Sequence, residues 1–347
     1  MKFKNLSTTD TKVSLACLGT MSFGAHVDEK TSHAVMSASL DQGINFFDTA
    51  ELYAVPPMAE THGKTEAFIG NWMTKNKTRD QIVLASKVVG DGRGLEWIRD
   101  GEHALNEKNI RNALEGSLQR LQTDHIDLYQ IHWPDRSIAK FGGRYYNAFA
   151  PEDTVPLEQT LRALQKLQQE GKIKHVGISN ESPWGTMEYL RLARDKDLPR
   201  MISIQNNYSL LTRTFDTGMS EISLQEDIGL LAYSPLGFGV LGGRYLNGNK
   251  PAEGRFVTYP DYMTRYRTPE VDAQTRRYQA LAHDHGMTLP ELSLAFVYSR
   301  PYLTSNIIGP SNVAQLTECV NAMNFEMTDE ILTEIDKIDA DLPNPCA

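Results

Sequence analysis

Four side chains that can hold or pass a proton follow short apolar runs of the sequence. Asp48, Lys87 and His132 each stand at or just after the end of such a run, and Tyr53 follows Asp48 closely. A charged or polar group against a buried strand is unfavourable unless it is paired or functional. If the runs are parallel strands, their carboxyl ends meet at one face. The four groups would then form an acid–base site with a carboxylate, a phenol, an ammonium and an imidazole.

Each of these residues also has a structural interpretation. An aspartate that closes a strand is commonly a turn or helix-cap residue. Asp48 and Lys87 together can form an ion pair that serves only the fold, and His132 can be a hydrogen-bonded histidine at a strand end. Any one of them alone would favour the structural interpretation, whereas their occurrence at successive strand ends favours a site.

The elements that must position these residues follow a repeating pattern. Eight short apolar runs, typical of buried strands, occur at 15–18, 44–47, 82–85, 126–131, 173–178, 201–204, 230–232 and 306–308. Helical patterns lie between most of them, and two are marked at their start: Ser182 before Pro183, and Thr288 with Glu291 as a capping box. The repeat predicts an α/β protein with a (β/α)8 barrel fold.

The remaining segments fit one barrel domain over residues 1–347. Residues 1–14 predict a hairpin outside the repeat, and the apolar spacing after Thr328 predicts an extra amphipathic helix near the C-terminus. An open doubly wound sheet is the alternative fold. It usually carries Gly-x-Gly-x-x-Gly after its first strand, and the run at 15–18 is followed by Gly19-Thr20-Met21-Ser22-Phe23-Gly24 instead.

Three connections are longer than usual and follow strands: 90–108, 134–155 and 237–268. They are expected to overhang the carboxyl face, where they would select the substrate. Their aromatic residues are expected to wall an apolar pocket; these are Trp97, Tyr145, Tyr146, Phe149, Tyr259, Tyr262 and Tyr266.

Composition narrows the class of protein. With 23% charged and 40% hydrophobic residues and no long apolar run, the chain is expected to be soluble and without a membrane partner. The three cysteines are far apart, so we expect no disulfide framework, no metal site and a reducing, cytoplasmic compartment. A net charge of −9 without a basic block argues against nucleic acid. The sequence leaves homo-oligomer formation open.

Several motifs, taken in order along the chain, resemble those of the aldo-keto reductase superfamily. They are Gly19-Thr20-Met21, Asp48-Thr49-Ala50 with Tyr53, Ser86-Lys87, His132, Gly177-Ile178-Ser179-Asn180, Gln205-Asn206 and Tyr233-Ser234-Pro235-Leu236. The run Val55-Pro56-Pro57 with Glu60-Thr61, Gly63 and Thr65-Glu66 is similar to the bacterial Tas-type branch. The resemblance covers essentially the whole chain, and it implies hydride transfer between NADP(H) and a small-molecule carbonyl or alcohol.

The resemblance assigns catalytic roles that physical chemistry also supports. Reduction of a carbonyl forms an alkoxide, and Tyr53 is expected to supply its proton. We expect Lys87 to lower the pKa of this phenol, Asp48 to hold Lys87 in place, and His132 to orient the carbonyl.

The resemblance also implies a set of cofactor-binding residues. Ser179, Asn180 and Gln205 would hold the nicotinamide carboxamide, and Tyr233 would stack on its ring. The expected set is Gly19, Thr20, Met21, Asp48, Ser179, Asn180, Gln205, Tyr233, Ser234, Pro235, Leu236, Gly237, Gly239, Arg244, Arg255, Gly309, Ser311, Gln315 and Glu318. Its glycines let backbone N–H groups approach phosphate oxygens.

Two departures from the family pattern concern the adenosine end. Cys319 stands where an asparagine often follows the glutamate, and no Lys or Arg lies within 309–320. Preference for NADPH over NADH would therefore depend chiefly on Arg255 and Ser311. Arg255 can instead be an exposed loop arginine.

Two other functions remain open from the sequence. Lys87 could form a Schiff base in a barrel lyase, because a desolvated lysine at a strand end is suited to that chemistry. The chain could also be a cofactor-sensing interaction subunit with little turnover. The sequence does not determine the physiological substrate or the direction of the reaction.

Overall fold

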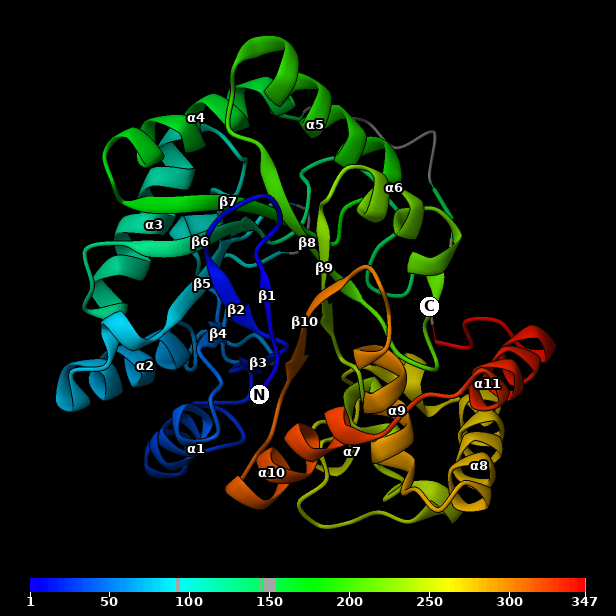
Figure 1. The fold of residues 1–347 in the computed structure, drawn as a ribbon. Helices are drawn as coiled ribbons and strands as arrows, with labels where there is room; N and C mark the ends of the chain where they lie inside the picture. Colours follow the sequence, from blue (N-terminus) through cyan, green and yellow to red (C-terminus); the bar gives the residue numbers. More distant parts are fainter. Residues whose placement is uncertain (92–93, 144, 147–153, 347) are drawn as a thin grey trace.

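The computed structural model describes residues 1–91, 94–143, 145–146 and 154–346. Eight parallel strands within these ranges close into a barrel with the order β10-β3-β4-β5-β6-β7-β8-β9 (Figure 1). The strands are β3 (Ala16–Gly19), β4 (Phe46–Asp48), β5 (Val83–Val88), β6 (Ile126–Ile131), β7 (Ile173–Ser179), β8 (Met201–Asn207), β9 (Gly229–Tyr233) and β10 (Leu303–Ile308). The predicted (β/α)8 barrel is confirmed, and each strand overlaps an apolar run of the sequence.

Helices surround the barrel and connect successive strands (Figure 1). They are α1 (Glu29–Asp41), α2 (Lys64–Asn76), α3 (Glu107–Leu121), α4 (Leu157–Gln169), α5 (Pro183–Lys196), α6 (Met219–Gln225), α7 (Arg255–Thr258), α8 (Pro269–Asp284), α9 (Leu289–Tyr298), α10 (Val313–Asn321) and α11 (Asp329–Asp341). Both predicted helix starts are confirmed: Ser182 accepts a hydrogen bond from the Gly185 N–H ahead of α5, and Thr288 with Glu291 forms the capping box of α9.

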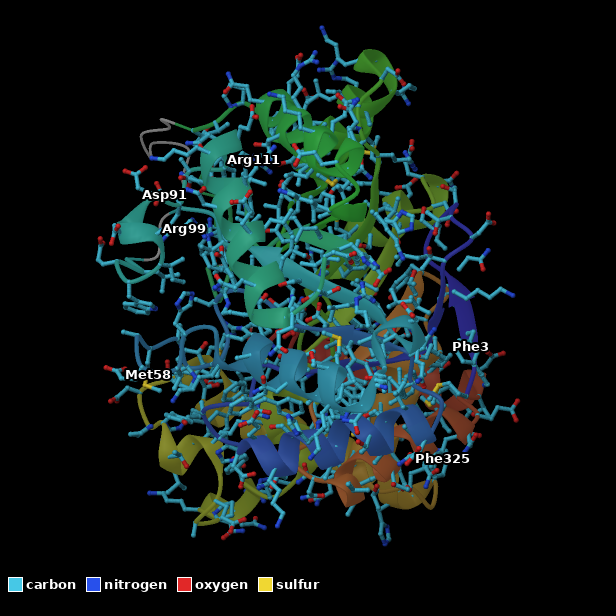
Figure 2. The ribbon with its side chains drawn as sticks, turned by 90° about the vertical axis from the view of Figure 1, so that its left-hand side faces the viewer. Phe3, Met58, Asp91, Arg99, Arg111 and Phe325 are labelled. Carbon is cyan, nitrogen blue, oxygen red and sulfur yellow. The ribbon has the colours of Figure 1, made fainter. Side chains whose placement is uncertain are left out.

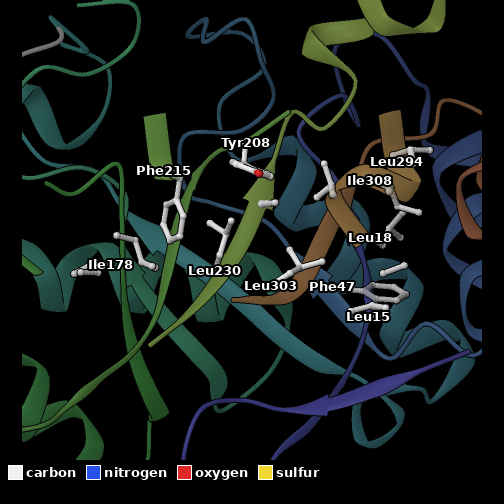
Figure 3. Close-up of a cluster of buried hydrophobic side chains, with 14 of the residues drawn as sticks. Leu15, Leu18, Phe47, Ile178, Tyr208, Phe215, Leu230, Leu294, Leu303 and Ile308 are labelled. Atoms are coloured by element: carbon white, nitrogen blue, oxygen red, sulfur yellow. The ribbon is translucent and has the colours of Figure 1, made fainter. Parts of the chain in front are cut away.

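Successive side chains of each strand point in opposite directions. One set fills the barrel interior, and the other fills the layer between the strands and the helices. Phe46 belongs to the interior cluster, whereas Phe47 points outward and stacks on Trp72 of α2 with ring centroids 5.5 Å apart. Figure 3 shows Phe47 among the outer cluster that packs along the strands. Because side chains alternate, Asp48 points inward like Phe46, and Lys87 points inward like Ala85.

The predicted hairpin is formed by β1 (Phe3–Asn5) and β2 (Lys12–Ser14), which pair antiparallel. Leu6 and Val13 pack in the same cluster as the interior residues of the barrel, so the hairpin closes the amino-terminal end. Figure 2 shows Phe3 at this end, and Met58, Asp91 and Arg99, which follow strands, at the opposite end. The site must therefore open at the carboxyl ends of the strands.

The long connections and the C-terminal segment complete the fold. The first connection ends where α3 begins at Glu107, and the third contains α7 and short 3-10 turns, including Thr264–Arg267. The predicted C-terminal helix is α11, which packs against α8. No helix within the described residues is both long and apolar enough to cross a membrane.

Candidate active site

The strand ends bring Asp48 and Lys87 together in the barrel interior. Asp48 is the last residue of β4 and pairs in register with Ala85 of β5, two positions before Lys87. Lys87 has no exposed surface, and Asp48 is 2% exposed. The Nζ of Lys87 lies 2.6 Å from Asp48 Oδ2 and 2.8 Å from the Thr49 carbonyl oxygen. A buried lysine of this kind is tolerated because an opposite charge and further acceptors satisfy its donors.

The third contact of the Lys87 ammonium is the hydroxyl of Tyr53, at 3.3 Å. Tyr53 lies in the segment that follows β4 and is 8% exposed, so its ring is packed into the protein. Asp48, Lys87 and Tyr53 thus form one contiguous set. The structure brings together these three groups as the sequence predicted.

The second carboxylate oxygen of Asp48 also accepts hydrogen bonds. Its Oδ1 accepts hydrogen bonds from Gln205 Nε2 at 2.8 Å and from Gln130 Nε2 at 3.2 Å. Gln130 lies within β6, where the sequence shows only an apolar run, and its inward position follows from alternation with Leu128. With both oxygens bonded, the carboxylate has one fixed orientation, which also fixes Lys87.

The electrostatics of Tyr53 differ from the expectation. Burial, and then the charge of Asp48, raises the pKa of Tyr53 well above its usual value. The prediction that this pKa is lowered is wrong, because burial of the phenol dominates and Asp48, which lies 2.6 Å from the Lys87 ammonium, raises the pKa further. The phenol is therefore fully protonated at neutral pH.

His132 lies against Tyr53. Its ring meets the Tyr53 ring edge-on, with centroids 5.7 Å apart, and its backbone N–H donates to the Val88 carbonyl oxygen at 2.8 Å. The neighbouring ring of Trp133 lies 4.8 Å from that of His132. The imidazole and the phenol consequently share one wall of a cavity.

This cavity has a volume of about 310 Å³ and runs from Tyr53 and His132 to the start of α10. Nearly all of the site residues predicted from the sequence line this cavity. The lining includes Gly19, Thr20, Met21, Asp48, Tyr53, His132, Ser179, Asn180, Gln205, Tyr233, Ser234, Pro235, Leu236, Gly239, Arg244, Arg255, Gly309, Ser311, Gln315 and Glu318. Lys87 and Gly237 do not line it: Lys87 lies behind Asp48 and Tyr53, and the Gly237 N–H closes a turn onto the Ser234 carbonyl oxygen at 2.8 Å.

Polar groups beside the catalytic residues form a linked chain. The Tyr233 hydroxyl donates to Asn180 Oδ1 at 2.7 Å, and Asn180 Nδ2 donates to the His132 carbonyl oxygen at 2.9 Å and to Ser179 Oγ at 3.1 Å. Gln205 directs its amide nitrogen to Asp48. The residues expected at the nicotinamide end are therefore adjacent to Asp48 and His132.

The far end of the cavity carries basic groups beside two glutamates, Glu253 and Glu318. Arg244, Arg255 and His26 line it, and neither arginine has a carboxylate within ion-pair distance in the part of the chain that is described. Arg255 is partly buried, with its guanidinium 5.0 Å from the centre of the Phe238 ring, so its interpretation as an exposed loop residue is wrong. Burial, and then Arg255 and Arg244, lowers the pKa of His26, and Glu253 partly opposes this shift. Such unpaired positive charge fits a phosphate-bearing ligand.

The backbone near this end approaches the cavity closely. Gly239 has a φ of +100°, a conformation that favours glycine, and lines the cavity. At the start of α10, Asn312 caps the helix, and Gln315 Oε1 accepts a hydrogen bond from the Ser311 N–H at 2.9 Å. A helix start at this point favours an anion.

The apolar walls differ from the prediction. Trp97, Tyr145 and Tyr146 are exposed; Tyr259, Tyr262 and Tyr266 are not among the lining residues, and Phe149 lies outside the described residues. The walls near Tyr53 are formed by Met21, Leu52, Val55, Trp133 and Phe141. Met21 was expected at the cofactor and Val55 belongs to a quoted motif, but Leu52, Trp133 and Phe141 did not stand out, because an apolar residue after a strand is equally typical of packing. No group of three or more residues that could hold a metal occurs within the described ranges.

Comparison of the sequence with known proteins identifies a family and several relatives. The sequence pattern of the Aldo/keto reductase family matches residues 16–340. "Protein tas" of Escherichia coli is 42% identical over 338 residues, covering 97% of this chain and 97% of that protein. The "Uncharacterized oxidoreductase YrpG" of Bacillus subtilis is 33% identical over 342 residues, covering 97% and 96%. A rice protein named "Probable voltage-gated potassium channel subunit beta" is 29% identical over 347 residues, covering 98% and 96%.

Proposed function

Because the chain belongs to the Aldo/keto reductase family, whose curated relatives include an oxidoreductase, we propose that it reduces aldehydes or ketones to alcohols with NADPH. The observation that carries this proposal is the position of Tyr53. Its ring lines the cavity beside His132, and its hydroxyl lies 3.3 Å from the buried ammonium of Lys87. This arrangement provides one protonated acid at the wall of a pocket that would also hold a long anionic cofactor.

Tyr53 is proposed as the proton donor. Its raised pKa keeps the phenol protonated, so a proton is available whenever a substrate is bound. NADPH would supply the hydride, and the substrate oxygen would then become basic enough to take the proton from a buried phenol. A positioned acid of this kind typically contributes about 10²–10⁴-fold to the rate.

Lys87 and Asp48 would act on the oxygen of Tyr53. Once the proton has left, the phenolate needs a nearby positive charge, and the Lys87 ammonium is already within 3.3 Å. Asp48 and the Thr49 carbonyl oxygen hold that ammonium in place. The cost of rearranging the site during the reaction is therefore small.

His132 is proposed to orient the carbonyl. It lies next to Tyr53 on the same wall, so a carbonyl oxygen could accept hydrogen bonds from both rings. Two donors that converge on one oxygen select a single approach of the carbonyl carbon to the cofactor. The bulky Trp133 beside His132 would limit entry of water.

Residues at both ends of the cavity support NADPH as the cofactor. Asn180 and Ser179 lie next to His132, where a carboxamide could exchange hydrogen bonds with them. Arg255 offers a planar guanidinium suited to the adenosine phosphate, and Ser311 stands near the start of α10. Cys319 also lines the cavity, but burial raises the pKa of its thiol to about 12, so it offers only a weak, neutral contact to adenine.

The two rival functions receive less support. A Schiff-base lyase needs a lysine with an accessible amine, whereas Lys87 is buried, makes three hydrogen bonds and does not line the cavity. A cofactor-sensing role is favoured by one comparison, the rice relative named as a potassium channel subunit. That role predicts tight cofactor binding without turnover.

The experiment that tests the proposal follows cofactor absorbance during incubation with NADPH and a panel of aldehydes and ketones. We expect oxidation of NADPH that depends on the carbonyl compound, with formation of the matching alcohol. Tight NADPH binding with no turnover of any compound in the panel would support the sensing role instead. Covalent trapping of a carbonyl compound on Lys87 by borohydride would support the lyase.

A further inference from the structure

Arg265 lines the cavity and belongs to the turn Thr264–Arg267 of the long connection after β9. A Cβ placed on Gly142 would lie 3.2 Å from the Cδ of Arg265, so the arginine packs against the connection that follows β6. Phe141, beside Gly142, packs edge-on against Trp133 with ring centroids 5.6 Å apart. Arg265 therefore joins two long connections above the wall that carries His132.

The charge of Arg265 also reaches Tyr233, one of the predicted cofactor-binding residues. It lowers the pKa of Tyr233, although burial outweighs this effect and leaves the pKa of that phenol raised. The Tyr233 hydroxyl donates a hydrogen bond to Asn180, and the Asn180 amide donates one to the carbonyl oxygen of His132. This places Arg265 near the nicotinamide end and not with the basic groups at the far end of the cavity.

Arg265 has no acidic partner among the residues that the structure describes. Its Nε is buried without a hydrogen bond, and its guanidinium lies 5.0 Å from the centre of the Tyr266 ring. Two other arginines on nearby connections are paired: Arg99 with Glu51, and Arg136 with Glu181. A partly buried guanidinium is always charged, and its hydrogen bond with the neutral phenol of Tyr266 does not balance that charge. Leaving the charge without an anion is unfavourable unless a ligand supplies one.

We propose that Arg265 binds a carboxylate of the substrate, so that the preferred substrates are aldehydes or ketones that carry an anionic group. This inference depends on the proposed carbonyl reduction. The apolar body of the substrate would lie against Leu52, Trp133 and Phe141, with its carbonyl oxygen at Tyr53 and His132. Arginine suits this role because its planar fork matches both carboxylate oxygens.

The test compares matched substrates. Para- and meta-formylbenzoate differ from their methyl esters mainly in charge, because the ring and the aldehyde are the same. We expect kcat/KM for the better acid to exceed that of its ester by about 10- to 100-fold, the range expected for a charged hydrogen bond. Arg265→Gln should remove this preference mainly through KM, and Arg265→Lys should retain part of it. The dissociation constant of NADPH should stay unchanged in both variants.

Arg267→Gln provides the matched control. Arg267 lies in the same turn, is exposed, and donates to the Pro260 carbonyl oxygen instead of lining the cavity. This variant removes the same charge from the same segment and should keep the preference for the acid. An undiminished preference in Arg265→Gln would overturn the inference. So would a loss that appears in NADPH affinity, because Arg265 would then be a cofactor residue.

Failure of the proposed function is distinguishable from failure of this inference. Turnover of the neutral esters without preference for the acids leaves carbonyl reduction in place and rejects the role of Arg265. If no compound is turned over, calorimetric titration of benzoate into the protein with NADP⁺ still tests the site. Binding by the wild type that is lost in Arg265→Gln supports the carboxylate site, and equal heats for the two proteins reject it.

Discussion

The Lys87 ammonium lies 2.6 Å from a carboxylate oxygen of Asp48, with both side chains buried at the carboxyl end of neighbouring strands. Two glutamine amides hold the other oxygen of Asp48, and the ammonium also contacts Tyr53. The pair thus connects the barrel interior to the cavity wall. Its loss is expected to change both the stability of the fold and the acidity of the phenol.

Asp48→Asn tests this coupling through stability. Removing one partner of a buried ion pair leaves the other charge uncompensated, so we expect a loss of about 3–5 kcal/mol in the free energy of unfolding. Urea denaturation of the variant and the wild type measures it. Asp124→Asn, which removes an exposed carboxylate, is the control and should change stability little. A loss in Asp48→Asn no larger than that of the control would contradict the pairing as described.

The same variant should shift the pH dependence of reduction. Asp48 raises the pKa of Tyr53, so replacing it removes this contribution and leaves an unpaired ammonium beside the phenol. The pKa of Tyr53 should fall. A proton donor loses activity as pH rises through its pKa, so the alkaline loss of kcat/KM should begin at a lower pH in the variant. Superimposable pH–rate profiles would show that Asp48 does not act on the phenol.

Arg255→Ala tests the choice of cofactor. If Arg255 holds the adenosine phosphate, the variant should bind NADPH about 1.5–3 kcal/mol more weakly and NADH almost unchanged, as expected for hydrogen bonds to a charged group. Dissociation constants for both cofactors at one ionic strength provide the measurement, with Arg267→Ala as the control outside the cavity. Equal losses for NADPH and NADH would mean that Arg255 only orders its connection.

His26 offers an independent test at the same end of the cavity. Burial, Arg255 and Arg244 lower its pKa, so near pH 6 less of it is protonated than in a free histidine, whose pKa is about 6.5. A phosphate dianion bound beside it would raise that pKa, so NADP⁺ binding should take up protons and NAD⁺ binding should take up fewer. Calorimetry in buffers of different ionisation enthalpy counts these protons. His26→Gln should abolish the difference, and identical uptake for both cofactors would place the phosphate elsewhere.

The fold could be predicted from the sequence because its signals are local. A barrel strand buried on both faces needs an apolar run, and β6 spans the same residues as the run that predicts it. Asp48, Lys87 and His132 stood out for the same reason, since each is a polar residue beside such a run. Helix starts at Ser182 and Thr288 also follow from local capping chemistry.

Other parts of the site depend on contacts between distant segments. Gln130 faces Asp48 only because β6 lies two strands from β4 in the closed barrel, and Arg265 reaches the cavity only because its connection folds back over the mouth. His26 has no motif around it that suggests a ligand. The pKa of Tyr53 was mispredicted because burial, and then the charge of Asp48, raises it, and neither the burial nor the distance to Asp48 can be read from spacing in the sequence.

The most direct test of the proposed function measures a single turnover of NADPH and an aldehyde in the wild type and in Tyr53→Phe. This variant removes only the hydroxyl and keeps the packed ring. We expect unchanged NADPH affinity and a rate of cofactor oxidation lower by about 10²–10⁴-fold, the usual contribution of a positioned acid. A rate close to that of the wild type would contradict the assignment of Tyr53 as the proton donor.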